Sequence, residues 1–590
     1  MAVTRYKLAL NNARFPLVSS WGQRAVVVPG SDLTTRTFRG YQGAEENLDY
    51  NIPQILGGEN FVPVTNGVKS VGYVKIGDQF DGVFKGFDQV FPLRDDEENA
   101  VLFSPAGGRN FRKTLSGAWS EFLLENLWAA QSPALYLSTT STNTPATAKV
   151  SRAYVDGRTI VAYSNIALTD TDGSPDRDED GSLYVWNPST QALELIYPFD
   201  DSGEFRNLPT EVAIGTIGGV ASSNGYLLVW SGLSIYWAFW DGTSFDFAPF
   251  KNGAATGSGG QIPEDVQGPI TAVIPVSGGF IIFTTKNAVA AFYTANNFEQ
   301  PWVFRAISNA GGIESYEQAT VDGNLSSIYA YTTGGLQRIS LNSAESDFPD
   351  VTDFLGGRWI EHFNTDSLTF HSGQVNAEFF VKVTYCGQRL LVISYGTYPG
   401  VYSYALVYDM QLQRWGKLRI VHRDCFSYSY GSQEGDLTYA AVWDVSYEDL
   451  GETTYEDMVV ASSPIVYPKQ SVAFLLATGE IRIAVLDYRE KLDTSESFVV
   501  IGRNQLSRAR LSTLHEAEIE GLRPGGRVAV MTSSNGHTFD KREEGVLREQ
   551  AGDYSEWGFD MPTGKNHTLF IKGDFSLTTL ILHATHDGAI

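Results

Sequence analysis

The chain has 590 residues, a formal net charge of -25, and 43% hydrophobic and 13% aromatic residues. Its length exceeds one ordinary core and predicts two to four domains. The acidic balance argues against a phosphate-binding surface, because nucleic-acid affinity depends on clustered Lys and Arg. It leaves two interpretations open: a charge that serves solubility, or an acidic wall past which DNA moves without sticking.

The sequence contains two cysteines, Cys386 and Cys425. Two cysteines in so long a chain do not form a disulfide framework, and their apolar neighbours predict buried free thiols. Residues 1–10 contain no apolar segment of signal-peptide length, and no run of about 18 apolar residues predicts a membrane span. We therefore expect synthesis in a cytoplasm and a chain without a membrane span.

Residues 1–150 are the least regular part and are predicted to be an irregular, β-rich N-terminal region. Short strands are expected over 61–64, 71–76 and 100–103. Ser116–Ala130 is the best helix candidate, because its large apolar residues recur near helical spacing and Ser116 can cap its start. The Ser-, Thr- and Pro-rich segment 131–148 is expected to be a connector.

Residues 151–487 repeat one pattern, in which a turn glycine precedes two apolar, aromatic-rich runs separated by a tight turn. The leading glycines are Gly157, Gly225, Gly279, Gly323 and Gly387. Small antiparallel sheets that recur in this way predict β-propeller-like repeats. About six units are expected, with five or seven equally compatible with the uneven spacing.

Residues 488–590 are expected to form a separate C-terminal β-domain, a small sandwich or barrel. Strands are predicted over 498–501, 516–519, 528–532, 569–571 and 577–583. Asn535-Gly536 is a strong hairpin-turn signal, because both residues accept positive φ. The whole chain is thus predicted to be all-β.

An acidic segment supplies the one candidate metal site. Asp176, Asp178 and Asp180 alternate and are followed by Gly181, a pattern that can wrap Ca²⁺ in oxygen ligands. Only half of an EF-hand pattern is present, because Asn187 stands where the last acidic ligand belongs. A solvated acidic hairpin tip is the alternative interpretation.

The remaining motifs do not point to catalysis. The pairs His583 with His586 and His515 with His567 can approach each other, but no His-x-x-x-His or Cys-x-x-Cys spacing occurs. No Gly-x-Ser-x-Gly elbow or phosphate-binding loop is present. We expect no enzyme and no cofactor other than the candidate Ca²⁺.

Several segments resemble nozzle or tail-hub virion proteins of short-tailed bacteriophages. The similar segments are Arg14–Leu17, Gly72–Ile76, Leu102–Gly108, Gly334–Leu341 and Phe348–Phe354. The resemblance implies a structural protein of the virion tail with a propeller hub. It implies a sixfold homo-oligomeric ring around a DNA channel, which contacts portal or adaptor proteins and holds tail fibres.

Two other functions stay open from the sequence. Abundant carboxylates are compatible with a propeller glycosidase or polysaccharide lyase. The aromatic residues are compatible with a carbohydrate-binding adhesin, although most of them lie in strand-like runs that predict core packing.

Overall fold

The structure is a computed structural model and describes the following residues: 3–13, 25–26, 55–80, 91–94, 100–106, 109–113, 120–122, 149–155, 157–164, 183–187, 192–195, 217–239, 259–295, 297, 300–346, 348, 351, 355, 360–364, 369–373, 379–386, 389–398, 400–431, 468–477, 481–487, 497–506, 511–533 and 541–586. Strands dominate these residues and form several mainly antiparallel sheets, which confirms the all-β prediction.

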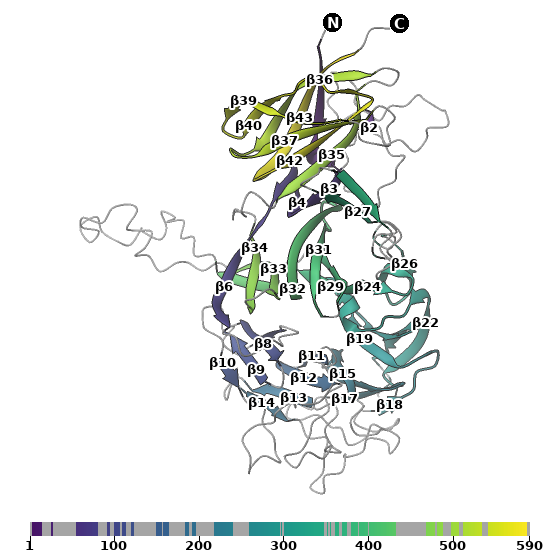
Figure 1. The fold of residues 1–590 in the computed structure, drawn as a ribbon. Helices are drawn as coiled ribbons and strands as arrows, with labels where there is room; N and C mark the ends of the chain where they lie inside the picture. The colour runs from purple at the N-terminus through teal and green to yellow at the C-terminus, as the bar shows by residue number, and fades with distance from the viewer. Residues whose placement is uncertain are drawn as a thin grey trace, which may run out of the picture.

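Five four-stranded antiparallel sheets follow one another along the chain (Figure 1). The first contains β7 (Phe91–Arg94), β8 (Ala100–Ala106), β9 (Arg109–Lys113) and β10 (Ser120–Phe122). The second contains β11 (Lys149–Val155), β12 (Arg158–Ser164), β13 (Leu183–Asn187) and β14 (Ala192–Leu195). The third contains β15 (Ile217–Ser223), β16 (Tyr226–Ser231), β17 (Ser234–Phe239) and β18 (Gly259–Gln261).

The fourth sheet contains β19 (Ile270–Val276), β20 (Gly279–Thr284), β21 (Asn287–Tyr293) and β22 (Trp302–Gly311). The fifth contains β23 (Ala319–Val321), β24 (Ile328–Thr332), β25 (Gly335–Ile339) and β26 (Ala344–Glu345), preceded by the 3-10 helix η4 (Tyr316–Gln318). A two-stranded hairpin of β27 (Ile360–Asn364) and β28 (Thr369–Gly373) comes next.

The long strand β32 (Arg414–Gly431) belongs to two consecutive groups of strands. Its first part pairs with β31 (Tyr402–Asp409), next to β30 (Leu390–Gly396) and β29 (Phe380–Cys386). Its second part pairs with β33 (Pro468–Leu476), and the register shifts between His422 and Asp424. One strand therefore passes directly from one four-stranded group into the next.

The group that begins with the second part of β32 is completed by the N-terminal part of the chain. After β33 comes β34 (Ile481–Asp487), which pairs antiparallel with β6 (Gly72–Phe80). The last group along the chain is thus closed by one of the first strands.

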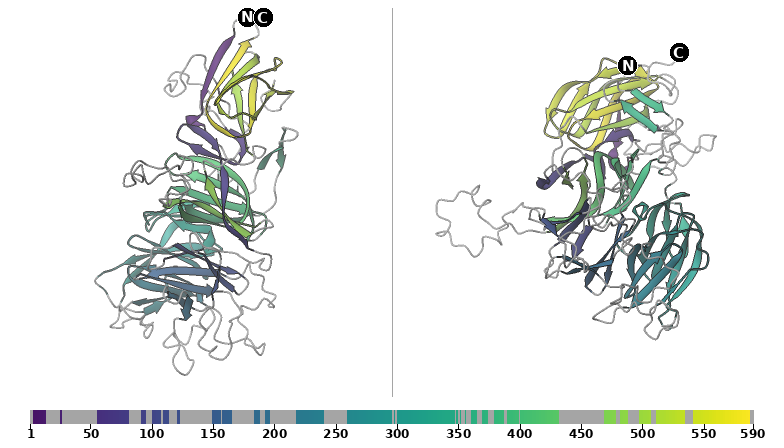
Figure 2. Two further views of the ribbon diagram at one scale, coloured as in Figure 1. Left: turned by 90° about the vertical axis from the view of Figure 1, so that its left-hand side faces the viewer. Right: turned by 60° about the horizontal axis from the view of Figure 1, so that its bottom comes forward.

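Consecutive sheets pack against each other through shared apolar clusters. The cluster around Trp230, Trp237 and Phe280 joins the third and fourth sheets. Others join the second to the third, the fourth to the fifth, and the fifth to the β29–β32 group. Figure 2 shows the successive sheets packed next to one another in two further views.

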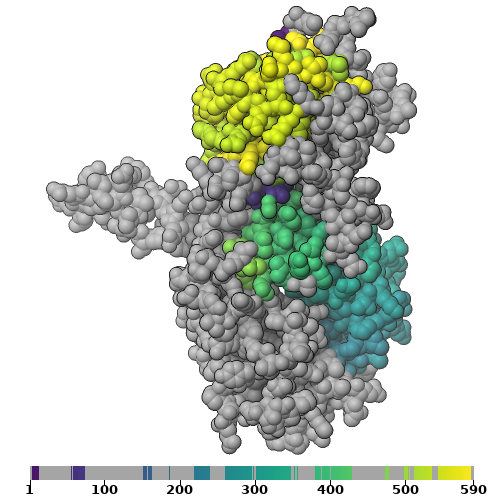
Figure 3. Space-filling model, viewed as in Figure 1, coloured from purple at the N-terminus to yellow at the C-terminus, as the bar shows by residue number. Residues whose placement is uncertain are grey.

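A C-terminal unit consists of two sheets packed face to face. One contains β1 (Thr4–Ala9), β43 (Phe575–His586), β36 (Ser512–Leu522), β40 (Tyr554–Gly558) and β39 (Val546–Ala551), with β5 (Gly67–Ser70) and β41 (Thr563–Gly564) attached. The other contains β2 (Ala25–Val26), β3 (Ile55–Glu59), β35 (Phe498–Gln505), β42 (Asn566–Lys572), β37 (Arg527–Ser533) and β38 (Lys541–Glu544). Both contribute to one core that includes Leu8, Ile519 and Ile571. Figure 3 shows this unit in yellow beyond the green surface of the β29–β32 group.

The two units are joined by β4 (Phe61–Val64) and by one arginine. β4 pairs with β5 on one side and with β32 through Phe61 and Lys417 on the other. The buried Arg414 side chain donates hydrogen bonds to the carbonyl groups of Leu10, Gly67 and Val64.

The sequence predictions for individual elements had mixed outcomes. Strands are present where they were expected, for example β4, β8 and β35. The helix prediction over Ser116–Ala130 is wrong for Ser120–Phe122, which pairs with β9 as strand β10. Pairing with a neighbouring strand overrides the helical spacing there. The rest of that segment lies outside the described residues, as does Asn535-Gly536.

The predicted domain boundaries at residues 150 and 487 remain predictions. Strand pairing crosses both of them, because β6 pairs with β34 and β1 pairs with β43. The N-terminal residues are thus distributed between the two units.

Candidate functional site: a cavity between the sheets

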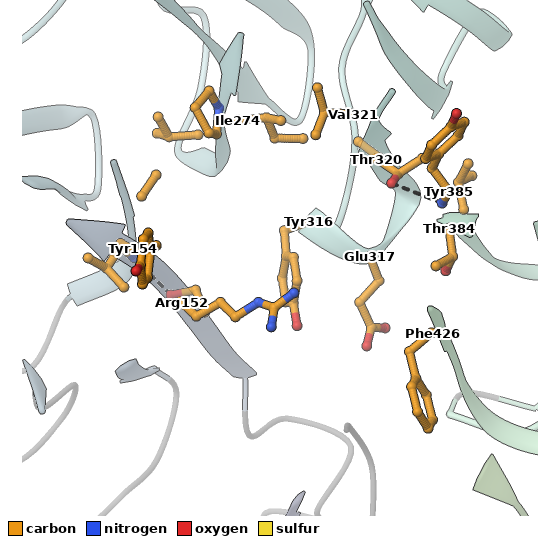
Figure 4. A pocket seen from close by; sticks show the side chains of 18 of the residues that line it. Arg152, Tyr154, Ile274, Tyr316, Glu317, Thr320, Val321, Thr384, Tyr385 and Phe426 are labelled. Atoms are coloured by element: carbon orange, nitrogen blue, oxygen red, sulfur yellow. Dashed lines mark hydrogen bonds between the residues drawn. The ribbon is translucent and has the colours of Figure 1, made fainter. Parts of the chain in front are cut away.

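A cavity of about 730 Å³ lies where the first strands of successive sheets face each other. Its wall is formed by β11, β15, β19, η4 with β23, β29 and the second part of β32. Figure 4 shows side chains from these elements pointing toward the shared space. The cavity is therefore formed by strands of several sheets together and not by a single loop.

Strand β11 shows how the sequence places polar groups in the cavity. Successive strand residues point to opposite faces. Ala153 and Val155 are buried in the core shared with the next sheet, whereas Arg152 and Tyr154 are exposed and line the cavity. An alternating Ser-Arg-Ala-Tyr-Val segment thus gives one apolar face and one face with a cation and an aromatic ring.

Lys382 on β29 is the centre of a charged group on the opposite part of the wall. Its ammonium nitrogen contacts the Asp424 carboxylate and lies 3.7 Å from Glu317 Oε1. Burial alone lowers the pKa of Lys382, but the charges of Asp424 and Glu317 outweigh it and raise the pKa well above its ordinary value. Lys382 is consequently a permanent cation shared by two carboxylates.

Arg152 and Tyr316 extend this group across the cavity. Figure 4 shows the Arg152 side chain pointing toward the Tyr316 ring. Burial, with the nearby Glu317 charge, raises the pKa of Tyr316, so its hydroxyl stays protonated. Arg152 faces the open space of the cavity, but protein atoms surround that space, and the resulting desolvation lowers the pKa of Arg152, while Tyr316 and Asp424 oppose that effect. Arginine remains charged at neutral pH even so.

The two thiols lie behind this wall. Cys386 and Cys425 are free and buried in one apolar cluster, as predicted. Burial, with Cys386 nearby, raises the pKa of the Cys425 thiol, which keeps it protonated. They act here as small apolar side chains.

The charged groups of the cavity wall are better suited to binding or to stabilising the fold than to acid–base chemistry. A glycosidase needs two carboxyl groups that face the substrate in different protonation states. Here Glu317 and Asp424 both contact one ammonium group, and the Asp424 side chain is only 4% exposed. Arg152 and Tyr154 are the groups that the cavity leaves most accessible.

The residues that the sequence singled out lie elsewhere. Asp176, Asp178 and Asp180 fall outside the described residues, so the candidate Ca²⁺ site remains a prediction. Within the described part of the chain, no cluster of three or more His, Cys, Asp or Glu side chains could hold a metal ion.

Four histidines of the C-terminal unit each have a separate hydrogen-bond partner. His515 contacts Thr585, His567 contacts Ser512, His583 contacts Glu518 and His586 contacts Tyr6. These partners are not the histidines of the predicted pairs. Three of the four contacts lie within the sheet of β1, β43 and β36, and the contact of His567 with Ser512 joins the two sheets.

The cavity residues themselves were not predicted. One signal was available, because Lys382 stands within the apolar run Phe379–Tyr385 and Arg152 within a strand-like segment. A charged residue inside a buried strand requires a partner. The sequence gives no indication of which residues on other sheets supply it.

Comparisons with known proteins give little further information. No protein-family model matches the chain, and no curated protein matches it. Among solved structures, the extracellular domain of the hybrid two-component system BT4673 from B. thetaiotaomicron is 10% identical with a TM-score of 0.36. That likeness covers 95% of this chain and 66% of the other, so the chain spans just under two thirds of its length.

A second solved structure, apo AztD from Citrobacter koseri, is 11% identical with a TM-score of 0.29. That likeness covers 56% of this chain and 85% of the other. TM-scores this low establish neither a shared fold nor a shared function. In the described residues, no helix has the length and apolar character needed to cross a membrane.

Proposed function

We propose that the protein is a structural subunit of a bacteriophage tail, a nozzle or hub that assembles into a ring around the DNA path. The proposal includes a seven-bladed propeller: five four-stranded sheets and two further groups that share β32. In this interpretation β6 closes the last blade, an arrangement that ties the two ends of a propeller together. The resemblance to tail-hub proteins supplies the biological role.

The observation that carries a structural role is the use of charge in the cavity. Glu317, Lys382 and Asp424 come from three different elements, and the Lys382 ammonium group contacts both carboxylates. Loss of one partner of such a pair leaves an uncompensated charge and is destabilising, so the pairs favour this arrangement of the three elements. These three charged groups therefore stabilise the packing of the sheets against one another, as expected for a structural subunit.

The cavity also bears on where DNA would pass. Its volume is about 730 Å³, and Arg152 points across it toward Tyr316. A DNA duplex, whose major groove alone is about 12 Å wide, does not fit such a space. In the proposed ring the DNA path lies between subunits, and the net charge of -25 is compatible with a lining that repels phosphates.

Immunogold electron microscopy of phage particles that carry this gene tests the proposal. Antibodies are raised against the exposed strand β39 of the C-terminal unit. The expected result is label at the tail of intact particles, with pre-immune serum as the control. Label confined to capsids, or protein found only free in the lysate, contradicts the proposal.

A further inference from the structure

We propose that the C-terminal unit binds one ordered water molecule in its interior, held by Asn504, His567 and Thr532. The three residues form a row across the neighbouring strands β35, β42 and β37, because His567 stands opposite Asn504 on one side and opposite Thr532 on the other. All three are at most 1% exposed. The site lies apart from the cavity between the sheets, and the proposal does not depend on ring assembly.

The row faces the core between the two sheets of the unit. His567 Nε2 lies 2.8 Å from the hydroxyl oxygen of Ser512, which belongs to β36 of the facing sheet. Residues two apart on a strand project from the same face. Leu569 on β42 and Val530 on β37, each two residues from a member of the row, both belong to the core between the sheets. His567 and Thr532 are therefore enclosed between the sheets.

The hydrogen bonds of Ser512 fix the tautomer of His567. The Ser512 hydroxyl donates its single hydrogen to the carbonyl oxygen of Gly564, at 3.3 Å, so it accepts the hydrogen of His567 Nε2. Burial lowers the pKa of His567 to about 4, and the neutral ring has no second hydrogen. His567 Nδ1 is consequently an acceptor, and no protein group donates to it.

Asn504 presents a second acceptor and Thr532 presents a hydroxyl. The Asn504 amide nitrogen donates to the carbonyl groups of Ile501 and His567, at 3.5 and 3.1 Å. These bonds orient the side chain, and its Oδ1 atom, like Thr532 Oγ1, has no protein partner. The acceptors of Asn504 and His567 cannot satisfy each other, and buried polar atoms in proteins almost always have a hydrogen-bond partner.

Contacts within the unit bring the three residues into one neighbourhood. The Asn504 side chain is bonded to the backbone of His567, and the His567 ring is bonded through Ser512 to Gly564. A Cβ atom built on Gly564 would lie only 2.9 Å from Thr532 Cβ. The lack of a side chain at Gly564 therefore lets Thr532 approach the segment to which His567 is tied.

A water molecule matches the three unpartnered atoms in number and in kind. It donates one hydrogen to Asn504 Oδ1 and one to His567 Nδ1, and it accepts the hydrogen of the Thr532 hydroxyl. Buried waters typically make about three hydrogen bonds to polar groups that otherwise lack a partner. A cation fits less well, because none of the three side chains is charged and an unpaired buried charge is costly. The water thus connects three strands of one sheet and, through His567, the facing sheet.

A crystal structure of the full chain, at a resolution that shows ordered waters, tests the proposal. The expected result is one peak of density about 2.7–3.2 Å from each of Asn504 Oδ1, His567 Nδ1 and Thr532 Oγ1. Absence of that peak overturns the proposal, as does a metal ion identified there by anomalous scattering. Direct hydrogen bonds from these three atoms to other protein groups would also overturn it.

A double-mutant cycle tests the shared water in solution. Asn504→Ala and Thr532→Val each remove one partner of the water, and the two side chains have no direct hydrogen bond to each other. The urea midpoint of the double variant should fall by less than the sum of the two single shifts, because the second substitution acts on a water that is already weakly held.

The control cycle combines Asn504→Ala with Thr579→Val, which alters a half-buried threonine on β43 of the facing sheet. Thr579 has no part in the proposed site, so these two shifts should add. Additive shifts in both cycles overturn the proposal. If Asn504→Ala does not fold, the crystal structure of the wild-type chain decides the question.

Discussion

Val485 of β34 and Val74 of β6 stand directly opposite each other in an antiparallel ladder, although most of the chain lies between them. The pairing makes an N-terminal strand the last strand of the final four-stranded group. The stability of the whole arrangement of sheets should therefore depend on a short segment near the start of the chain.

Replacing both Val74 and Lys75 by proline tests this dependence. Successive amides of a strand point to opposite sides, so one of the two prolines must remove a donor that faces β34. We expect the free energy of unfolding, measured with urea, to fall by about 1–3 kcal/mol. The matched double alanine variant keeps both amides and should lose much less. Equal losses would show that β6 does not close the group through its backbone.

Arg414 should hold the C-terminal unit to the sheets. Arg414→Met removes donors from the carbonyl groups of Leu10 and Gly67, at 3.3 and 3.4 Å, and of Val64. Leaving buried acceptors unsatisfied should lower stability by about 2–4 kcal/mol and separate the calorimetric transitions of the two units. Arg338→Met breaks an exposed pair with Glu345 and should change stability by less than about 1 kcal/mol. A single unshifted transition in Arg414→Met would contradict this role.

Lys382→Met should be among the most destabilising substitutions in the cavity wall. It leaves the Asp424 carboxylate buried without its partner, which typically costs about 3–5 kcal/mol. Adding Asp424→Asn removes the uncompensated charge and should restore part of that loss. A double-mutant cycle by chemical denaturation measures the coupling, and additive losses would argue against a direct pair.

Two buried histidines predict a loss of stability under mild acid. Burial lowers the pKa of His422 and of His567 to about 4 each. Above the ordinary value of about 6.5 both the folded and unfolded states are neutral, and the stability is complete. As the pH falls from 6.5 toward 4, only the unfolded chain takes up protons, so stability is lost.

At pH 5 the loss should be about 2 kcal/mol for each histidine, relative to pH 7.5. His422 is held by the Ile420 carbonyl and the Ser394 hydroxyl, at 2.8 and 2.7 Å. Comparing urea unfolding at the two pH values for wild type and His422→Gln checks this. The variant should lose about half of the pH dependence, and an unchanged dependence would show that other groups cause it.

The repeating part of the fold could be predicted because each sheet is local in sequence. β16 and β17 pair across the turn at Gly232, whose φ of +57° suits glycine, so neighbouring residues contain the whole signal. The pairing of β6 with β34 and of β1 with β43 could not be predicted. These pairs join distant segments, and nothing in either strand alone specifies its partner.

The candidate site was missed for the same physical reason. Lys382 and Asp424 belong to different strand groups, and Arg152 lies on a third. Charge partners separated in this way have no fixed spacing in the sequence. The candidate Ca²⁺ ligands of Asp176–Asp180 could be identified from the sequence because they are close together in the chain. The cavity residues are far apart in the chain.

The mass of the purified protein, measured by light scattering together with negative-stain images, tests the tail-hub proposal most directly. The proposal predicts closed rings of about six subunits that form as the protein concentration rises. A chain that stays monomeric over the whole accessible concentration range, with no rings in the images, would contradict it.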